Sequence, residues 1–343
     1  MKKILYIGYN IDNIYNKYKE GLFGSHLLYG AIELEKMGYE ISYLSHSTQK
    51  GFFKYFKDII DIKRKNVDIL FCPYIKGLFY LFLYIAQKTG YLRSLKIMGV
   101  LHFTPKITLF NKFYIKQMYK IFNKIYFHSY KNLEECINLH LVDKNQTEIL
   151  NWGVDLSYID KNKCQNLQVK ETFISTGIEN RDFSTLIKVF SGTDEDLNIY
   201  VFHDTQIIKS NVPNIMIHKI IKEKNNQSYT VMKVKESTCV VVPINEQGLT
   251  YCTGHTSIVE ALALGKPVIV TDNIYHPIDV EKEGVGLKVG FEDVEAWKNA
   301  IAYIRNNPNL IQEMGTKGRI LAETKYNIMQ CALQLHQYIQ FLN

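Results

Sequence analysis

The feature that most constrains this fold is a regular alternation of short β-branched and aromatic runs with longer amphipathic segments. Such alternation is typical of βαβ units, in which helices cover both faces of a parallel sheet. In the first half, strands are expected at Lys3–Ile7, Ile41–Ser45, Ile69–Cys72, Ile97–His102 and Lys124–His128. The pattern then starts again, with strands expected at Thr172–Ser175, Ile199–Phe202, Ile215–His218, Cys239–Pro243 and Pro267–Thr271.

The two sets of strands are separated by the turn Asn151-Trp152-Gly153-Val154-Asp155 and the polar stretch Asp160–Lys170. We therefore place the first domain at residues 1–155. The fold class predicted is α/β, with two Rossmann-like, doubly wound domains facing a central cleft. Ligands of such open sheets collect at the carboxyl ends of the strands.

One helix is predicted from about Ser25 to Met37. Apolar residues recur there with helical spacing, and Gly38 follows as a stop signal. The loop before it, Gly21-Leu-Phe-Gly24, precedes a helix start but lacks the full GxGxxG pattern, so it is a weak phosphate-loop signal by itself.

Composition limits the class of protein more than its function. Of the 343 residues, 46% are hydrophobic and 22% are charged, which excludes a disordered chain. The net charge of +7 is compatible with an anionic substrate, an anionic membrane surface or nucleic acid. The six cysteines are scattered without a CxxC pair, so we expect reduced thiols, and neither a zinc site nor a disulfide scaffold.

The apolar runs are too short for a signal peptide or a membrane span, which needs roughly 18–20 apolar residues. The longest, Gly77–Ala86, reaches about half that length. We therefore expect a cytoplasmic protein, with the inner face of the membrane as an alternative location.

The most informative segment runs from Tyr251 to Thr271, where a small glycine-containing loop leads into a helix expected to start near Thr256 or Ser257. The free N–H groups at such a helix start can hold a diphosphate. Glu260 lies one turn inside, where its carboxylate could accept two ribose hydroxyls. A capping hydroxyl and an ordinary helix glutamate would account for the same residues.

This segment resembles the C-terminal signature of GT-B-fold glycosyltransferases, in particular the large retaining family 4, also called glycosyl transferases group 1. The resemblance rests on the glycine loop, Glu260 and the following Ala-Leu-Ala-Leu-Gly-Lys-Pro-Val. It implies a donor site in which Glu260 holds the nucleotide ribose. The loop facing the diphosphate and sugar would comprise Gly254, His255, Thr256 and Ser257. A second family glutamate is replaced here by Cys252.

Further matches extend the resemblance along the chain. The segment from Ser175 to Ile187 resembles the strand, loop and helix that open the donor domain. By this resemblance Gly177 allows close phosphate approach and Arg181 neutralises the leaving diphosphate, a task suited to a guanidinium. An exposed surface arginine is the alternative.

The resemblance also covers the chain ends. The tail resembles the family's closing helices, which implies a donor-binding domain at residues 156–328 and a last helix, 329–343, packing back on the N-terminal domain. Gly24 lies in a loop that resembles the family's glycine-rich loop near donor and acceptor. His102 follows a strand where some relatives place a histidine near the reacting groups. A structural histidine is equally compatible with that position.

No metal site is expected. The triplet Asp194-Glu195-Asp196 spells the DxD of metal-dependent transferases, but it precedes a strand and so lies at the end opposite the expected site. We expect no cofactor, and a co-substrate of the UDP-sugar or GDP-sugar type. Charge on the leaving diphosphate would be stabilised by a helix N-terminus, Arg181 and Lys188.

The leading functional hypothesis is metal-independent hexosyl transfer to a glycan or lipid-linked hydroxyl in cell-surface polysaccharide or glycolipid synthesis, with retained configuration. The alternatives are a UDP-sugar epimerase of GT-B fold and a non-catalytic nucleotide-binding partner, the latter suggested by Cys252. Aromatic and basic residues interleave at Phe52–Lys57 and Phe110–Lys120, which allows peripheral membrane contact through the N-terminal domain. An ordinary amphipathic helix is the alternative. No nucleic-acid-binding motif accompanies these stretches.

Overall fold

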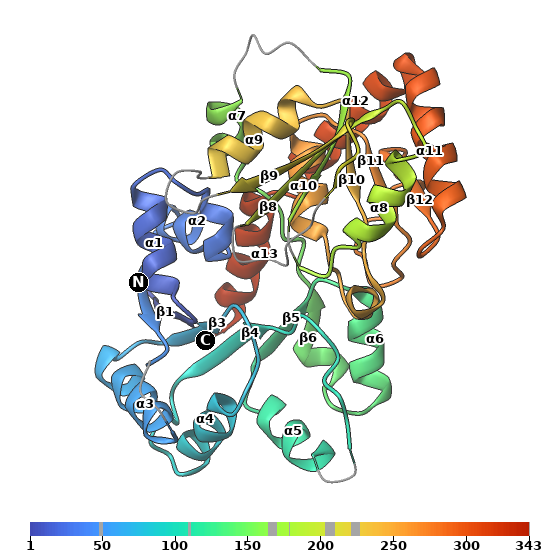
Figure 1. Cartoon of the computed structure of the whole chain (residues 1–343). Coiled ribbons are helices and arrows are strands. Elements are labelled where there is room, and N and C mark those ends of the chain that lie inside the picture. Colours follow the sequence, from blue (N-terminus) through green and yellow to red (C-terminus); the bar gives the residue numbers. More distant parts are fainter. Residues whose placement is uncertain are drawn as a thin grey trace. The chain divides into compact units, whose positions relative to one another are not determined.

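The computed structural model describes residues 1–47, 51–108, 111–163, 170–177, 179–202, 210–220 and 227–342. The chain divides into two compact units. The first unit comprises residues 1–20, 25–152 and 328–343, and the second comprises residues 21–24 and 153–327. Each unit is a doubly wound α/β structure, which confirms the predicted fold class (Figure 1).

The described part of the first unit contains a parallel sheet of six strands in the order β2-β1-β3-β4-β5-β6. Apolar strand residues face helices α3 to α6 in one continuous core. The strands are β1 (Lys3–Gly8), β2 (Glu40–Ser45), β3 (Ile69–Cys72), β4 (Lys96–Val100), β5 (Lys124–Phe127) and β6 (Thr147–Ile149). The helices are α1 (Ile11–Lys19), η1 (Ser25–Leu28), α2 (Ala31–Lys36), α3 (Phe53–Lys65), α4 (Phe79–Lys88), α5 (Lys112–Tyr119), α6 (Tyr130–Asn138), η2 (Lys144–Gln146) and α13 (Ile328–Phe341).

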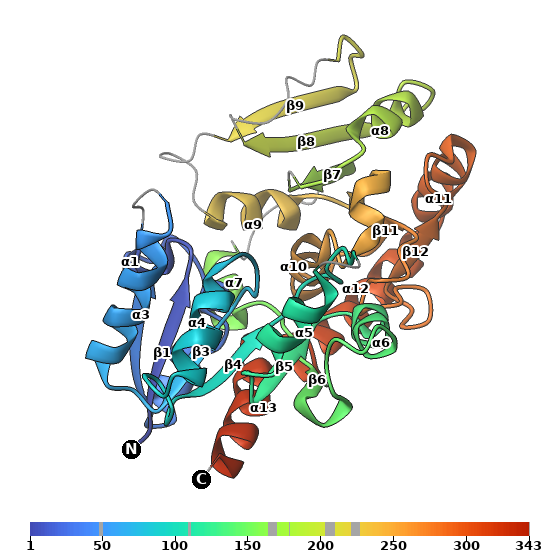
Figure 2. The same cartoon turned by 90° about the horizontal axis from the view of Figure 1, so that it is seen from below.

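The second unit has six described strands in the order β12-β11-β10-β7-β8-β9, and Figure 2 shows β9 at the outer edge beside β8 and β7. Its core packs the sheet against α8, α11 and α12. The strands are β7 (Thr172–Thr176), β8 (Asp196–Phe202), β9 (Ile215–Ile220), β10 (Cys239–Val242), β11 (Val268–Thr271) and β12 (Gly286–Val289). The helices are α7 (Leu156–Asn162), α8 (Phe183–Phe190), α9 (Gln227–Glu236), η3 (Glu246–Thr250), α10 (His255–Ala263), α11 (Val294–Asn306) and α12 (Pro308–Thr324).

The last helix, α13, belongs to the first unit and packs against α2. A Cβ on Gly30 would lie 3.1 Å from Ala332, so the two helices approach closely at a glycine. The Tyr39 hydroxyl lies 2.9 Å from His336 Nδ1, and the Lys2 ammonium donates to Ile339 O at 2.8 Å. The chain thus returns to its first domain at Ile328, next to the expected start of the closing segment.

The single helix predicted from Ser25 to Met37 is wrong. The segment forms η1, then a break, then α2. Tyr29 and Gly30 both have positive φ, 50° and 80°, which no continuous right-handed helix allows. The Ser25 hydroxyl donates to Glu33 Oε1 at 2.6 Å, a contact that stabilises the broken form.

Each of the ten strands predicted from the sequence overlaps an observed strand, with ends that differ by a few residues. Two observed strands, β6 and β12, were not predicted. Both are short: β6 has three half-buried residues, and β12 has only two buried ones, so each gives a weak apolar signal. The five cysteines in the described residues are free and buried.

Candidate functional site

The topology of the second unit predicts where a ligand can bind. Its strand order has the form 3-2-1-4-5-6, with β7 as the first strand and β10 as the fourth. The connections after β7 and β10 therefore run in opposite directions, which opens a crevice at their carboxyl ends. The segments that follow these strands carry Gly177 and Arg181 on one side and Gly254 to Glu260 on the other.

The loop after β7 makes its turn at Gly177, whose φ is 93°. A Cβ at this position would lie 2.5 Å from Arg181 Nη2 and 3.3 Å from Ser257 Oγ. Only glycine therefore allows both the turn and the close approach of the arginine. The turn folds the Arg181 side chain back toward the start of α10.

Arg181 is held at three points, with Nε donating to Thr176 O (3.3 Å), Nη1 to Glu179 O (3.0 Å) and Nη2 to Ser257 Oγ (3.1 Å). In the described part of the chain, no carboxylate forms a salt bridge with it. Burial lowers its pKa to about 10, so it stays charged at neutral pH. A fixed, buried cation that forms no salt bridge among the described residues is suited to an anionic ligand.

Helix α10 begins beside this guanidinium. Its N-cap is Gly254, with φ 87° and no side-chain cap. A Cβ there would lie 2.7 Å from Val242 Cγ1, so the loop is closely packed. Because no capping side chain competes for the first-turn N–H groups, the positive end of α10 is available to an anion. Thr256 is exposed in that first turn, whereas Ser257 is buried against Arg181.

The His255 side chain is buried, with its ring 5.2 Å from the His276 ring and 6.0 Å from the Tyr326 ring. Burial lowers the pKa of His276 to about 4, so that ring is neutral at physiological pH. The structure therefore places the His255 imidazole in an aromatic cluster, while its backbone lies at the start of α10.

Glu260 lies one turn further along α10 and is only 9% exposed. Burial raises its pKa from the ordinary 4.5 to about 7. Its Oε1 accepts a hydrogen bond of 2.7 Å from Gln227 Nε2. Gln227 Oε1 in turn accepts from the backbone N–H of Gly24 at 3.1 Å.

Gln227 thus links two predicted site residues, Gly24 and Glu260, that are far apart in sequence. The loop of residues 21–24 belongs to the second unit, not to the N-terminal domain expected for it. Its Leu22 carbonyl accepts from the Gln227 backbone N–H (3.3 Å) and from the Tyr158 hydroxyl (2.9 Å). Sequence reasoning missed Gln227, because no motif marks it and only tertiary contacts reveal its place.

The Tyr251 side chain, which was not predicted as a site residue, connects the segments that follow β7 and β10. The Tyr251 hydroxyl donates to Glu179 Oε1 at 2.8 Å and accepts from Asn180 Nδ2 at 2.8 Å. Cys252, next to Tyr251, is buried, which raises the pKa of its thiol to about 12 and keeps it neutral. Glu179, two residues after Gly177, therefore supplies a carboxylate to this loop region.

His102 lies in the first unit, just beyond the carboxyl end of β4. Its Nε2 is 2.9 Å from Pro73 O, so this nitrogen carries the proton and donates, and it is 3.4 Å from the Tyr29 hydroxyl. Its ring packs 4.6 Å from that of Tyr74 and 5.0 Å from that of His128. These contacts hold the imidazole in one orientation.

The triplet Asp194-Glu195-Asp196 lies at the amino end of β8, as predicted, and so at the end of the sheet opposite the crevice. Within the described ranges, no group of three or more His, Cys, Asp and Glu side chains could hold a metal ion.

Part of the second unit is similar in sequence to a known family. Residues 226–320 match the family model of glycosyl transferases group 1. No curated protein matches the sequence.

Several solved structures share the fold over nearly the whole length of both chains. A glycosyltransferase from Rickettsia africae has a TM-score of 0.75 at 15% identity, covering 100% of this chain and 99% of its own. Sucrose-phosphate synthase from Thermosynechococcus elongatus has a TM-score of 0.70 at 15% identity, covering 100% and 99%. HepE from Anabaena, solved with UDP-glucose, has a TM-score of 0.68 at 11% identity, covering 99% and 100%.

The solved structures agree with the architecture. The chain has the GT-B glycosyltransferase fold, and its second unit carries the signature of glycosyl transferases group 1.

Proposed function

We propose that this protein transfers a hexosyl group from a nucleotide diphosphate sugar to a hydroxyl acceptor without a metal ion. The observation that carries the proposal is the Arg181 guanidinium beside the uncapped start of α10, with no salt bridge to a carboxylate among the described residues. Both groups would stabilise negative charge that develops on the departing diphosphate. Thr256 and Ser257 would offer their backbone N–H groups to the phosphate oxygens.

Glu260 would hold the donor ribose. Its Oε1 already accepts from the Gln227 amide, so ribose hydroxyls would replace or share that hydrogen bond. If Gln227 moves in this exchange, its hydrogen bond from the Gly24 N–H would change as well. His102 is proposed to lie near the acceptor, and retention of configuration is proposed from the family resemblance. HepE was solved with UDP-glucose, which supports a uridine donor as the first to test.

Removing the Glu260 carboxylate should weaken binding of the correct nucleoside diphosphate about 10- to 100-fold, because hydrogen bonds to a charged group are lost. Calorimetric titrations of UDP, GDP and ADP, each with EDTA, would measure this for wild type and Glu260→Ala. Exposed Glu313→Ala is the matched control, since it removes a carboxylate outside the crevice. Equal affinities for Glu260→Ala and wild type would exclude the ribose role.

The same site should depend on pH. Since the Glu260 pKa is about 7, protonation below that pH removes the charged acceptor and should weaken nucleotide binding. Glu260→Gln should abolish this dependence. Gln227→Ala should move the midpoint upward, because the amide hydrogen bond lowers the Glu260 pKa.

The stability of the protein should depend on the same proton. The folded protein keeps the Glu260 proton between pH 4.5 and about 7, whereas the unfolded chain loses it. Glu260 therefore makes the free energy of unfolding fall as the pH rises through that window.

Product analysis separates transfer from epimerisation. A transferase releases a nucleoside diphosphate only when an acceptor is present, whereas an epimerase leaves the nucleotide sugar intact and needs no acceptor. Binding without either reaction would identify a non-catalytic partner. Failure of every nucleotide to bind would remove all three functions.

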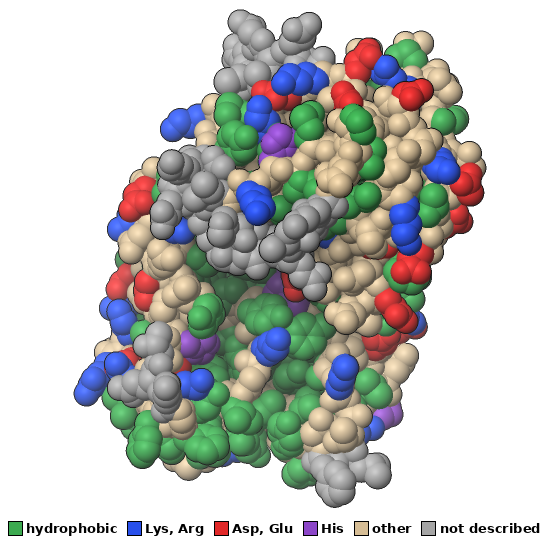
Figure 3. Space-filling model, viewed as in Figure 1, with side chains coloured by type: hydrophobic (Ala, Val, Ile, Leu, Met, Phe, Trp, Pro, Cys, Tyr) green, Lys and Arg blue, Asp and Glu red, His purple; other side chains and the backbone are tan. Residues whose placement is uncertain are grey.

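We also propose that the first unit contacts a membrane, where a lipid-linked acceptor would lie. Phe52, just before α3, is 62% exposed, and Phe53 and Phe56 on α3 are 78% and 55% exposed. With Ile85 of α4, 48% exposed, they define the aromatic ridge. Figure 3 shows hydrophobic side chains gathered on the surface in this α3–α4 region. Lys54 and Lys57 alternate with these rings in the first turns of α3 and add positive charge.

Exposed aromatic rings beside basic groups favour the interface of an anionic bilayer. In the described residues, no helix is both long and apolar enough to cross a membrane. The proposed contact is therefore peripheral, through the aromatic ridge.

Wild-type protein should float with vesicles that contain phosphatidylglycerol at low salt, and less at high salt, because the electrostatic part is screened. Phe53→Ser/Phe56→Ser should lose most of this binding. Phe341→Ser is the control, since Phe341 is 82% exposed on α13 outside the ridge. Absence of flotation at both salt concentrations, or equal loss in both variants, would contradict the proposal.

A further inference from the structure

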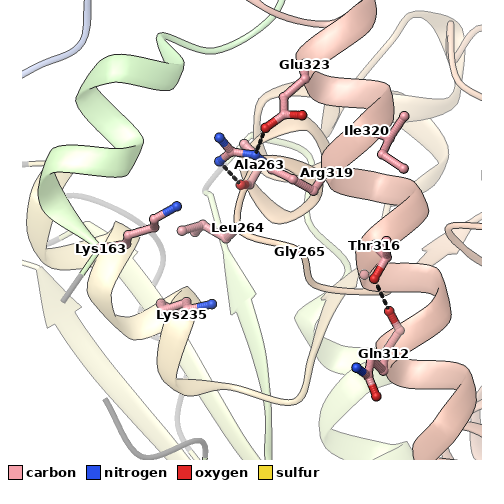
Figure 4. A pocket seen from close by; sticks show the side chains of 11 residues that line it. Lys163, Lys235, Ala263, Leu264, Gly265, Gln312, Thr316, Arg319, Ile320 and Glu323 are labelled. Atoms are coloured by element: carbon pink, nitrogen blue, oxygen red, sulfur yellow. Dashed lines mark hydrogen bonds and ion pairs between the residues drawn. The ribbon is translucent and has the colours of Figure 1, made fainter. Parts of the chain in front are cut away.

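A second pocket lies in the same unit as the donor crevice, at the opposite end of α10. It has a volume of ≈ 500 Å³. Figure 4 shows it between α9 and α12, with Lys163, Lys235 and Arg319 arranged around it. Glu323 is the single carboxylate among its described lining residues. None of these residues belongs to the predicted donor site.

Arg319 and Lys163 have fixed positions. The Arg319 guanidinium donates to both Asp160 oxygens at 2.8 Å and to Ala263 O at 2.8 Å, and its Nε pairs with Glu323 at 2.7 Å. Lys163 Nζ lies 2.6 Å from the same Asp160. Asp160 therefore forms salt bridges with two cationic side chains at once.

Lys235 differs from both. In the part of the chain that the structure describes, no acidic side chain forms a salt bridge with it. Burial lowers its pKa first, and the positive charges of Lys163 and Arg319 lower it further. Nearby Lys266 is buried and donates to Ser237 O at 2.5 Å, and its pKa falls to about 8 through burial and the charge of Lys235. The folded protein thus gathers positive charge here beyond what its carboxylates neutralise.

The opposite wall of the pocket is shaped by glycines. A Cβ on Gly315 would lie 2.3 Å from Gly265 O, so α12 can approach the end of α10 only with glycine at this point. Leu264 and Ile320 supply apolar surface, and Thr316 lies on the α12 side. The pocket therefore combines a cationic side with a small apolar wall. That combination fits a compact molecule with one phosphate group better than an extended polyanion.

We propose that this pocket binds a small phosphate monoester, with Lys235 as the principal contact and Lys163 and Arg319 beside it. A dianion would relieve the repulsion among the positively charged groups and would give Lys235 the ionic partner that it lacks among the described residues. The site is separate from the donor crevice and does not depend on the proposed transferase function.

Titration of inorganic phosphate and of glycerol 3-phosphate into Arg181→Ala protein tests the proposal, because that background weakens anion binding at the crevice. Adding Lys235→Gln should weaken binding at least tenfold, and Lys235→Arg should largely restore it. Lys317→Gln is the matched control, since Lys317 lies on α12, pairs with Glu313 and does not line the pocket. Equal affinity in the Lys235→Gln and Lys317→Gln proteins, or no phosphate binding, would overturn the proposal.

Two further measurements distinguish phosphate binding from a structural role of Lys235, and a soluble ligand from a lipid headgroup. Without phosphate, Lys235→Gln should melt no lower than wild type, because it removes a repelled charge; a purely structural lysine would give a lower melting temperature. Flotation with phosphatidylglycerol vesicles should be unaffected by Lys235→Gln if the ligand is soluble. Loss of flotation in that variant would instead assign the phosphate to a lipid headgroup and overturn the soluble-ligand proposal.

Discussion

Arg181→Ala should lower turnover about 100- to 1000-fold, the range typical of losing one preorganised group that stabilises transition-state charge. The guanidinium is held by Thr176 O, Glu179 O and Ser257 Oγ and needs no rearrangement to meet a diphosphate. Because its stabilisation grows as the diphosphate leaves, kcat should fall more than donor affinity. Initial rates at saturating donor and acceptor would measure the effect.

Two variants make this result specific. Arg181→Lys keeps the charge but loses the planar, multiply held geometry, so it should recover only part of the activity. Arg305→Ala removes a more exposed arginine of the same unit, which pairs with Glu171 and Glu195, and should leave turnover nearly unchanged. A near-wild-type kcat for Arg181→Ala would remove this residue from the catalytic site.

Gly153→Ala should destabilise the second unit by more than about 3 kcal/mol, because the new Cβ has no room. It would lie 1.8 Å from Tyr326 O and 2.4 Å from Asn327 N, which are backbone atoms that no rotamer change can move. The neighbouring Val154 forms a parallel bridge with Asn327, so this contact joins the two ends of the segment 153–327. Urea unfolding followed by tryptophan fluorescence would measure the change.

Gly8→Ala is the matched control. Its Cβ would meet Ile11 at 3.8 Å, an ordinary contact, and Gly8 is not among the glycines with positive φ. The expected change in the free energy of unfolding is within about 1 kcal/mol. If Gly153→Ala were as stable as Gly8→Ala, the close packing of the two segments would be contradicted.

Elements are predictable from the sequence where local residues alone determine their environment. The run Pro267–Thr271 is apolar and β-branched, so its assignment as a buried strand needs no distant partner. The helix expected to start near Thr256 or Ser257 is α10, which begins at His255. By contrast, the helix expected at Ser25–Met37 is interrupted by positive φ at Tyr29 and Gly30, and apolar spacing does not report on that break.

The amino-acid sequence by itself determined the α/β class, ten of the twelve described strands and the loop–helix segment that carries Gly254 and Glu260. These depend on local periodicity and turn chemistry, which neighbouring residues specify. Only the tertiary structure decided that Gln227 lies between Gly24 and Glu260, and that Arg181 contacts Ser257. Such contacts join segments distant in sequence, and their geometry depends on how the sheet orders its strands, so no local pattern encodes them.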